Sequence, residues 1–128
     1  MENLLYAQTQ HTPQIEFNEK EKTISITGNS YPEDSFSFYQ PIIQWLKEFM
    51  GNCSQNDTVK VIIFIDYMNS SSLKVYFEFF DILEEGNDKG VKIDIDWYYQ
   101  IDNDIAEETG EDFALDFETL DIKLISRN

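Results

Sequence analysis

The chain has 128 residues, of which 41% are hydrophobic and 15% aromatic, and its formal net charge at pH 7 is −16. This composition supplies enough apolar side chains for one folded domain and excludes an intrinsically disordered chain. The negative charge repels phosphate backbones and anionic lipid headgroups, so we expect neither a nucleic acid nor a membrane as a partner. It favours a protein partner that carries a basic patch.

The first half of the chain predicts a hairpin followed by a helix. Residues 1–13 show no regular pattern, and we expect them to form a loosely ordered lead-in. Apolar residues alternate through "QIEFNEKEKTISITG" (14–28), which predicts two strands joined by a charged turn. Apolar residues recur at helical spacing in "DSFSFYQPIIQWLKEFMGN" (34–52), where Asp34 can cap the helix and Pro41 can kink or restart it.

Strands and helices alternate in the rest of the chain. The near-continuous apolar run "TVKVIIFIDY" (58–67) is typical of a strand that is buried on both faces. The other predicted elements are a helix over 70–85, the alternating strand "VKIDIDWYY" (91–99), a short acidic helix in "NDIAEETGEDFA" (103–114) that Gly110 weakens, and a last strand in "TLDIKLIS" (119–126). The order ββαβαβαβ predicts a single α/β domain over residues 1–128, with a mixed sheet of about five strands.

The residues that most often support catalysis are scarce. His11 is the only histidine and Cys53 the only cysteine, and neither lies in a nucleophile motif, so we expect no catalytic triad, no disulfide and no cofactor. Four carboxylates on and just after the strand over 91–99 could hold Mg²⁺ or Ca²⁺, which leaves a metal-dependent enzyme as an alternative. A solvated acidic face explains them better, and we expect no metal site. They are Asp94, Asp96, Asp102 and Asp104.

Three consecutive serines follow the buried strand at the start of the second helix. Asn69 is a good N-cap, which places Ser70, Ser71 and Ser72 in the first helical turn with hydroxyls that capping does not need. Functional sites in open α/β sheets gather at such strand ends. A phosphate on Ser70 would lie near the positive end of the helix dipole and would add up to about two negative charges. The alternative is plain helix capping in a constitutive structural adaptor that is never modified.

Several segments resemble known signalling domains. "IDYMNSSSLKV" (65–75) is similar to the strand–helix junction of the anti-anti-sigma factors, the STAS domains, and the order of elements is STAS-like. The chain more closely resembles the SiaC-like family of bacterial regulatory phosphoproteins. That resemblance is carried by "GNSYPEDSFSFYQPIIQWLKEF" (28–49), "YMNSSSLK" (67–74) and "VKIDIDWYY" (91–99) followed by the acidic "GEDFA" (110–114).

This resemblance implies a non-enzymatic signalling protein. Family members are phosphorylated by a kinase related to anti-sigma-factor kinases and are dephosphorylated by a metal-dependent serine/threonine phosphatase. The unmodified form binds and activates a diguanylate cyclase, which links the family to cyclic-di-GMP and biofilm control. The modified residue follows the motif asparagine, so the resemblance maps it onto Ser70, with Ser71 and Ser72 as alternates and Asn69 shaping the junction.

The second helix also carries candidate contacts for the partner. Val75, Phe79 and Ile82 lie roughly opposite the helix face that should cover the sheet, and Lys74 lies one turn beyond Ser70. The three apolar side chains, Val75, Phe79 and Ile82, can pack against the first helix, or they can form an exposed docking patch. The family resemblance favours docking. The start "MENLLYAQTQ" does not read as a signal peptide, and we expect a cytoplasmic protein.

Overall fold

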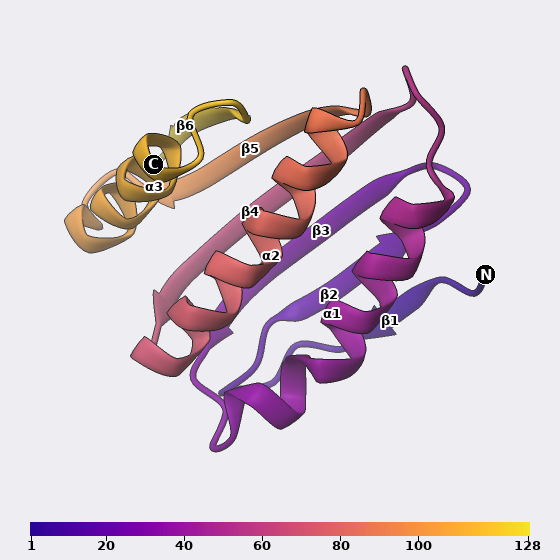
Figure 1. The fold of residues 1–128 in the computed structure, drawn as a ribbon. Coiled ribbons are helices and arrows are strands. Elements are labelled where there is room, and N and C mark those ends of the chain that lie inside the picture. Colours follow the sequence, from indigo (N-terminus) through magenta and orange to yellow (C-terminus); the bar gives the residue numbers. More distant parts are fainter.

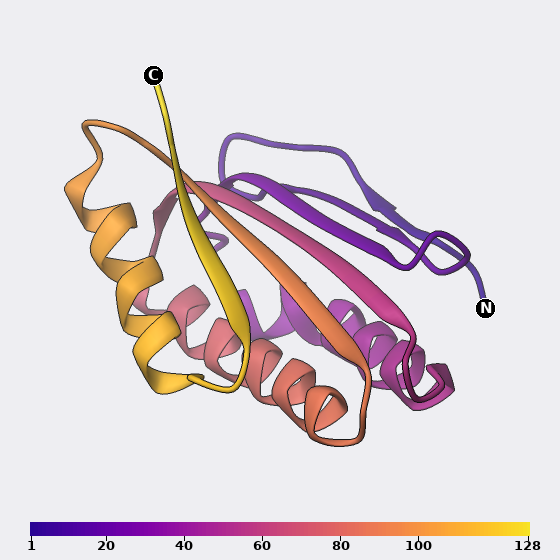
Figure 2. The ribbon, with the colours of Figure 1, turned by 90° about the horizontal axis from the view of Figure 1, so that it is seen from above.

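The alternating segments fold into a mixed sheet with three helices on one of its faces (Figures 1 and 2). We describe residues 1–128 from a computed structural model. The elements are β1 (Leu4–Tyr6), β2 (Gln14–Asn18), β3 (Thr23–Ser30), α1 (Ser35–Asn52), β4 (Thr58–Met68), α2 (Ser70–Asp88), β5 (Lys92–Gln100), α3 (Asp104–Asp116) and β6 (Asp121–Arg127).

The six strands lie side by side in the order of the sequence, β1 to β6. The strands β1, β2 and β3 pair antiparallel, whereas β3 to β6 pair parallel through helical crossovers. The single α/β domain with a mixed sheet is therefore confirmed, with one strand more than predicted. The additional strand is β1, in which Leu4 lies opposite Phe17 and Tyr6 opposite Ile15, so the lead-in contributes an ordered edge strand.

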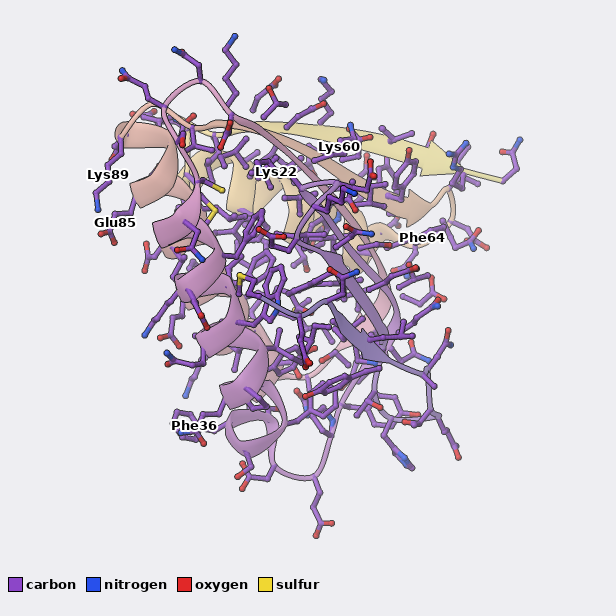
Figure 3. The ribbon with its side chains drawn as sticks, turned by 90° about the vertical axis from the view of Figure 1, so that its right-hand side faces the viewer. Lys22, Phe36, Lys60, Phe64, Glu85 and Lys89 are labelled. Atoms are coloured by element: carbon purple, nitrogen blue, oxygen red, sulfur yellow. The ribbon has the colours of Figure 1, made fainter.

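The helices bury one face of the sheet and leave the other uncovered. Val61 and Ile63 of β4 point into the core under the helices, whereas Lys60 and Phe64 lie on the opposite, open face (Figure 3). The prediction that β4 is buried on both faces is wrong, because all three helices lie on one side (Figure 2). Phe64 is only half-buried, against the ring of Tyr98 on β5, whose centroid lies 5.9 Å away.

The helix boundaries follow the predicted signals. Asp34 caps α1 by accepting a hydrogen bond from the backbone N–H of Ser37, and α1 runs through Pro41 as one helix to Asn52. None of the three helices is both long enough and apolar enough to cross a lipid bilayer. Because β3, β4 and β5 are parallel, their carboxyl ends meet at one edge of the sheet, where α1, α2 and α3 begin.

A ladder of ion pairs crosses the open face. Lys60 Nζ lies 2.9 Å from Asp94 and 2.8 Å from Asp96, and Lys123 Nζ lies 3.0 Å from Asp94. The hydrogen bonds from Lys60 and Lys123 hold the pKa of Asp94 below its usual value of 3.8. Two of the four carboxylates considered above as metal ligands are thus neutralised by lysines within the sheet.

This ladder predicts a pH-dependent contribution to stability. Because the folded-state pKa of Asp94 is lowered, its contribution is complete above pH 3.8 and is lost as the pH falls through the lower folded value. We expect Asp94→Asn to reduce the free energy of unfolding by about 0.5 kcal/mol at pH 7, since these side chains are one-third exposed, and by progressively less as the pH falls below 3.8. Urea denaturation at pH 7 and near pH 2, with Asp121→Asn as the more exposed control, measures the difference. A loss that persists undiminished near pH 2 would contradict it.

Candidate functional site

The junction between β4 and α2 is tied to the neighbouring strand and capped by Asn69. The Asn69 side chain accepts a hydrogen bond of 2.9 Å from the backbone N–H of Ser72, which confirms the predicted N-cap. The Asn69 backbone N–H donates to the carbonyl of Ser30, at the end of β3, over 3.0 Å. The first turn of α2 is therefore fixed against the carboxyl edge of the sheet.

The three serines occupy three different environments. Ser70 is exposed, and its hydroxyl takes part in no hydrogen bond within the chain. Ser71 is exposed but engaged, since its Oγ lies 2.8 Å from Ser35 Oγ and donates to Asn69 Oδ1. Ser72 is 0% exposed. The prediction of Ser72 as an alternate phosphate acceptor is wrong, because a kinase cannot reach a hydroxyl inside the core of the folded protein.

Ser72 belongs to a buried network of hydroxyls that joins β3, α1 and α2. Ser30 Oγ donates to Ser72 Oγ over 2.8 Å and lies 2.6 Å from the hydroxyl of Tyr39, which lies 3.0 Å from that of Tyr76. Ser35 Oγ completes the network 3.2 Å from Ser72 Oγ. Burial raises the pKa of both tyrosines, so the network consists of neutral hydroxyls.

This network was not predicted, although the sequence carries part of its signal. Ser30 and Ser35 flank the short loop between β3 and α1, and that loop meets the α2 junction because β3 and β4 are parallel neighbours. Serines at the ends of two adjacent parallel strands are thus expected to meet. Tyr39 and Tyr76 could not be found in this way, because helical spacing marks them only as core residues.

The network predicts that the three serines contribute unequally to stability. Ser72→Ala leaves the buried Ser30 hydroxyl without its acceptor, and we expect the free energy of unfolding to fall by about 1–3 kcal/mol. Ser70→Ala removes no hydrogen bond and should change it by less than about 0.5 kcal/mol. Chemical denaturation of both variants tests the difference. Equal losses would show that the hydroxyl network does not stabilise the fold.

The candidate partner contacts on α2 are not all available to a partner. Lys74 is exposed, and Val75 and Ile82 are half-buried, but Phe79 is 1% exposed and its assignment as a partner contact is wrong. The reason is that α1 packs along this side of α2. Val75 lines one hollow of about 170 Å³ between the two helices, and Ile82 lines another of about 350 Å³.

An exposed aromatic side chain lies close to the serines. Phe36, in the first turn of α1, is 69% exposed and lies at the end of the helical layer (Figure 3). It follows Ser35, whose hydroxyl contacts that of Ser71, and it lines the same hollow as Val75. Ser70 directly precedes Ser71, so its free hydroxyl lies at the same end of the two helices as this hollow. We call the surface at this end of α1 and α2, formed by Phe36, Lys74 and Val75, the switch surface.

The structure assembles no catalytic constellation from the other candidates. His11 lies against Tyr31, with ring centroids 5.1 Å apart, and its imidazole forms no hydrogen bond with Cys53 or with a serine. Asp94 and Asp96 pair with lysines in the middle of the open face, whereas Asp102 and Asp104 follow the end of β5. No group of three or more His, Cys, Asp or Glu side chains is arranged to hold a metal ion.

Comparison with known proteins yields a consistent set of relatives. The model of a family described as SiaC family regulatory phosphoprotein matches residues 6–127. An uncharacterized protein of Pseudomonas aeruginosa strain UCBPP-PA14 is 29% identical over 116 residues, which cover 91% of this chain and 90% of the relative.

Solved structures are similar over nearly the whole chain. A crystal structure of the diguanylate cyclase SiaD in complex with its activator SiaC, from Pseudomonas aeruginosa, matches with a TM-score of 0.89 and 27% identity over 97% of this chain and 99% of that chain. A structure of SiaC alone from the same organism matches with a TM-score of 0.85 and 26% identity over 99% of this chain and 100% of that chain.

Proposed function

Because the chain belongs to the SiaC family of regulatory phosphoproteins, we propose that it is a non-enzymatic signalling protein switched by reversible phosphorylation of Ser70. The observation that carries this proposal is the environment of Ser70. Ser70 is exposed and its hydroxyl forms no hydrogen bond within the chain, whereas Ser71 is hydrogen-bonded to Ser35 and Ser72 is buried. Ser71 remains the alternate acceptor, at the cost of its two hydrogen bonds.

The proposed effector is a diguanylate cyclase. The similar SiaC of Pseudomonas aeruginosa is described as the activator of the diguanylate cyclase SiaD, with which it forms a complex. We propose that this chain in its unphosphorylated form likewise binds a diguanylate cyclase through the switch surface and activates it. Its part in the synthesis of cyclic-di-GMP would then be to present a surface, with no chemistry of its own.

The chemistry of the switch requires a kinase and a phosphatase. We propose a protein kinase related to the anti-sigma-factor kinases and a metal-dependent serine/threonine phosphatase, acting in the cytoplasm where ATP is available. Lys74 is exposed one turn along α2 from Ser70, a spacing at which its ammonium group can reach a phosphate on Ser70. With one lysine, the site attracts a phosphate only weakly at an exposed position, so the modification stays accessible to the phosphatase.

The physical effect of the phosphate follows from its surroundings. It would lie at the N-terminus of α2, where the helix dipole favours negative charge, so the fold should tolerate it. It would also place a hydrated dianion at the same end of the helical layer as the exposed ring of Phe36. A partner that covers this apolar surface would have to desolvate the dianion, which opposes binding.

The experiment that tests this proposal is phosphopeptide mapping by tandem mass spectrometry of the protein taken from its native cells. We expect phosphate on Ser70 that a metal-dependent phosphatase removes, and none on Ser72. A chain that stays unmodified under several growth conditions would contradict the switch and favour a constitutive adaptor. Phosphate found on Ser71 alone would move the switch by one residue.

A further inference from the structure

A second exposed apolar surface lies at the carboxyl ends of β4 and β5, where α3 begins. Tyr67 is 56% exposed and Ile105 is 76% exposed, although both are large apolar side chains in a highly charged protein. They flank a hollow of about 90 Å³, and the buried ring of Trp97 forms part of its lining. A hollow of this kind can accept one apolar side chain from another molecule.

A wider acidic hollow continues from the apolar one. It has a volume of about 530 Å³ and shares Asp66, Asn103 and Ile105 with its neighbour. Asp102 and Asp104 add two more carboxylates. None of these three carboxylates forms an ion pair with a lysine or arginine, unlike Asp94 in the middle of the sheet.

No cation of the chain is engaged with this edge. Arg127 ends β6 nearby, but its guanidinium lies 4.5 Å from the centre of the Tyr98 ring on the open face of the sheet. Lys74 lies on α2 and pairs with no carboxylate. The negative charge of the three carboxylates is therefore left to solvent or to a partner.

Hydrogen bonds hold the two hollows in a fixed shape. The side chain of Asn103 caps α3 by accepting from the backbone N–H of Ala106 over 3.1 Å. Its Nδ2 donates to the carbonyl of Asp66 over 2.8 Å, which ties the start of α3 to the end of β4. Trp97 Nε1 donates to the carbonyl of Ala106 over 3.0 Å and anchors α3 from below. A partner would meet a preorganised surface and would lose little free energy in ordering it.

We propose that this surface binds a protein segment with one apolar anchor flanked by lysine or arginine. The anchor enters the hollow between Tyr67 and Ile105, and the basic side chains lie over Asp66, Asp102 and Asp104. Charge complementarity selects this occupant, because the carboxylates repel nucleic acids, anionic lipids and a second copy of a chain with net charge −16. The surface does not include Ser70, so this proposal goes beyond the phosphorylation switch and does not depend on it.

Two synthetic peptides test the proposal directly. Both have twelve residues and the same spacing of leucines, with lysine at every other position in one and glutamate in the other. Titration of the labelled full-length protein by NMR should show saturable binding of the lysine peptide, with the largest amide shifts at Tyr67 and residues 103–109. Binding of both peptides with equal affinity, shifts centred elsewhere, or no saturation at millimolar peptide would each overturn the proposal.

Matched variants on and beside α3 distinguish binding of the lysine peptide at this site from non-specific attraction to the negative charge of the protein. Ile105→Ser should weaken the lysine peptide at least fivefold, whereas Leu115→Ser, at a residue that is 77% exposed near the other end of α3, should not. Asp102→Asn should weaken it about threefold and Asp112→Asn should leave it unchanged. Ser70→Asp should leave the peptide affinity within twofold, which distinguishes this surface from the switch surface. Equal effects of each variant and its control would overturn the proposed site.

Discussion

Replacing Ser70 with aspartate is expected to weaken binding of the diguanylate cyclase about 100-fold while leaving the protein folded. The carboxylate introduces a hydrated charge at the end of α2 that carries the switch surface, and a partner that covers it must desolvate that charge. A 100-fold change in affinity corresponds to about 2.8 kcal/mol. Ser70→Ala should bind like the unmodified protein and should no longer respond to the kinase. Isothermal titration calorimetry with the cyclase measures both affinities, and cyclic-di-GMP formation reports the activation.

The stability of the same variant provides an independent check. A carboxylate in the first turn of α2 interacts favourably with the helix dipole, so Ser70→Asp should raise the free energy of unfolding by about 0.3–1 kcal/mol. Loss of binding together with unchanged or increased stability therefore identifies a surface effect and excludes unfolding. A variant that still activates the cyclase at the affinity of the unmodified protein would disprove the switch at Ser70.

A matched control places the same charge at the opposite edge of the sheet. Ser54 is exposed in the loop between α1 and β4. This loop precedes β4, whereas the α2 junction follows β4 at the other end of the strand. Ser54→Asp makes the identical change in net charge, so it should leave the affinity for the cyclase within twofold. If Ser54→Asp weakened binding as much as Ser70→Asp, long-range repulsion and not the local position of the phosphate would control the interaction.

The sequence predicts the junction well because its signals are local. An asparagine after an apolar strand and before a helical pattern is sufficient to identify Asn69 as an N-cap, and the alternation of strands and helices is sufficient for the parallel arrangement. Placing Ser70 in the first helical turn follows from the same two facts. These features depend on neighbouring residues in the chain and not on what packs against them.

The errors arise where distant elements decide the outcome. Helical spacing gives the angular position of Phe79 on α2 but not whether α1 covers it, and α1 buries it. The burial of Ser72 depends in the same way on Ser30 and Ser35. The strand β1 is too short to show a pattern and forms only because its residues pair with β2. The uncovered second face of β4 follows from the placement of all three helices on one side of the sheet.

Replacing Gly110 with alanine should have a second large effect, a loss of stability. Helix propensity alone would predict a gain in stability for this substitution. Alanine is favoured over glycine within a helix by about 1 kcal/mol, so Gly110 alone would be read as a weak point of α3. A Cβ at this position would lie 2.5 Å from both Cδ1 and Nε1 of Trp97, and the Trp97 ring is fully buried. The glycine is therefore what allows α3 to approach the sheet.

We expect Gly110→Ala to lower the free energy of unfolding by up to about 2 kcal/mol, since overpacking of about 1–3 kcal/mol opposes a propensity gain of about 1 kcal/mol. The melting temperature should fall by several degrees. Gly51→Ala is the matched control, because a Cβ there would meet no atom within 4 Å in the last turn of α1. That variant should be neutral or slightly stabilising. A stabilised Gly110→Ala would show that the Trp97 ring can move aside.

A double-mutant cycle assigns the cost to the contact itself. In a Trp97→Val background the ring atoms that the new Cβ would meet are removed, so Gly110→Ala should cost at least 1 kcal/mol less than it does in the native background. Trp97→Val will be destabilising by itself, because it also removes the hydrogen bond to the carbonyl of Ala106, but the cycle subtracts that effect. An additive cycle would place the cost elsewhere in α3. A strongly coupled one would mean that the close approach of α3 to β5, which also shapes the hollow between Tyr67 and Ile105, depends on the absence of one methyl group.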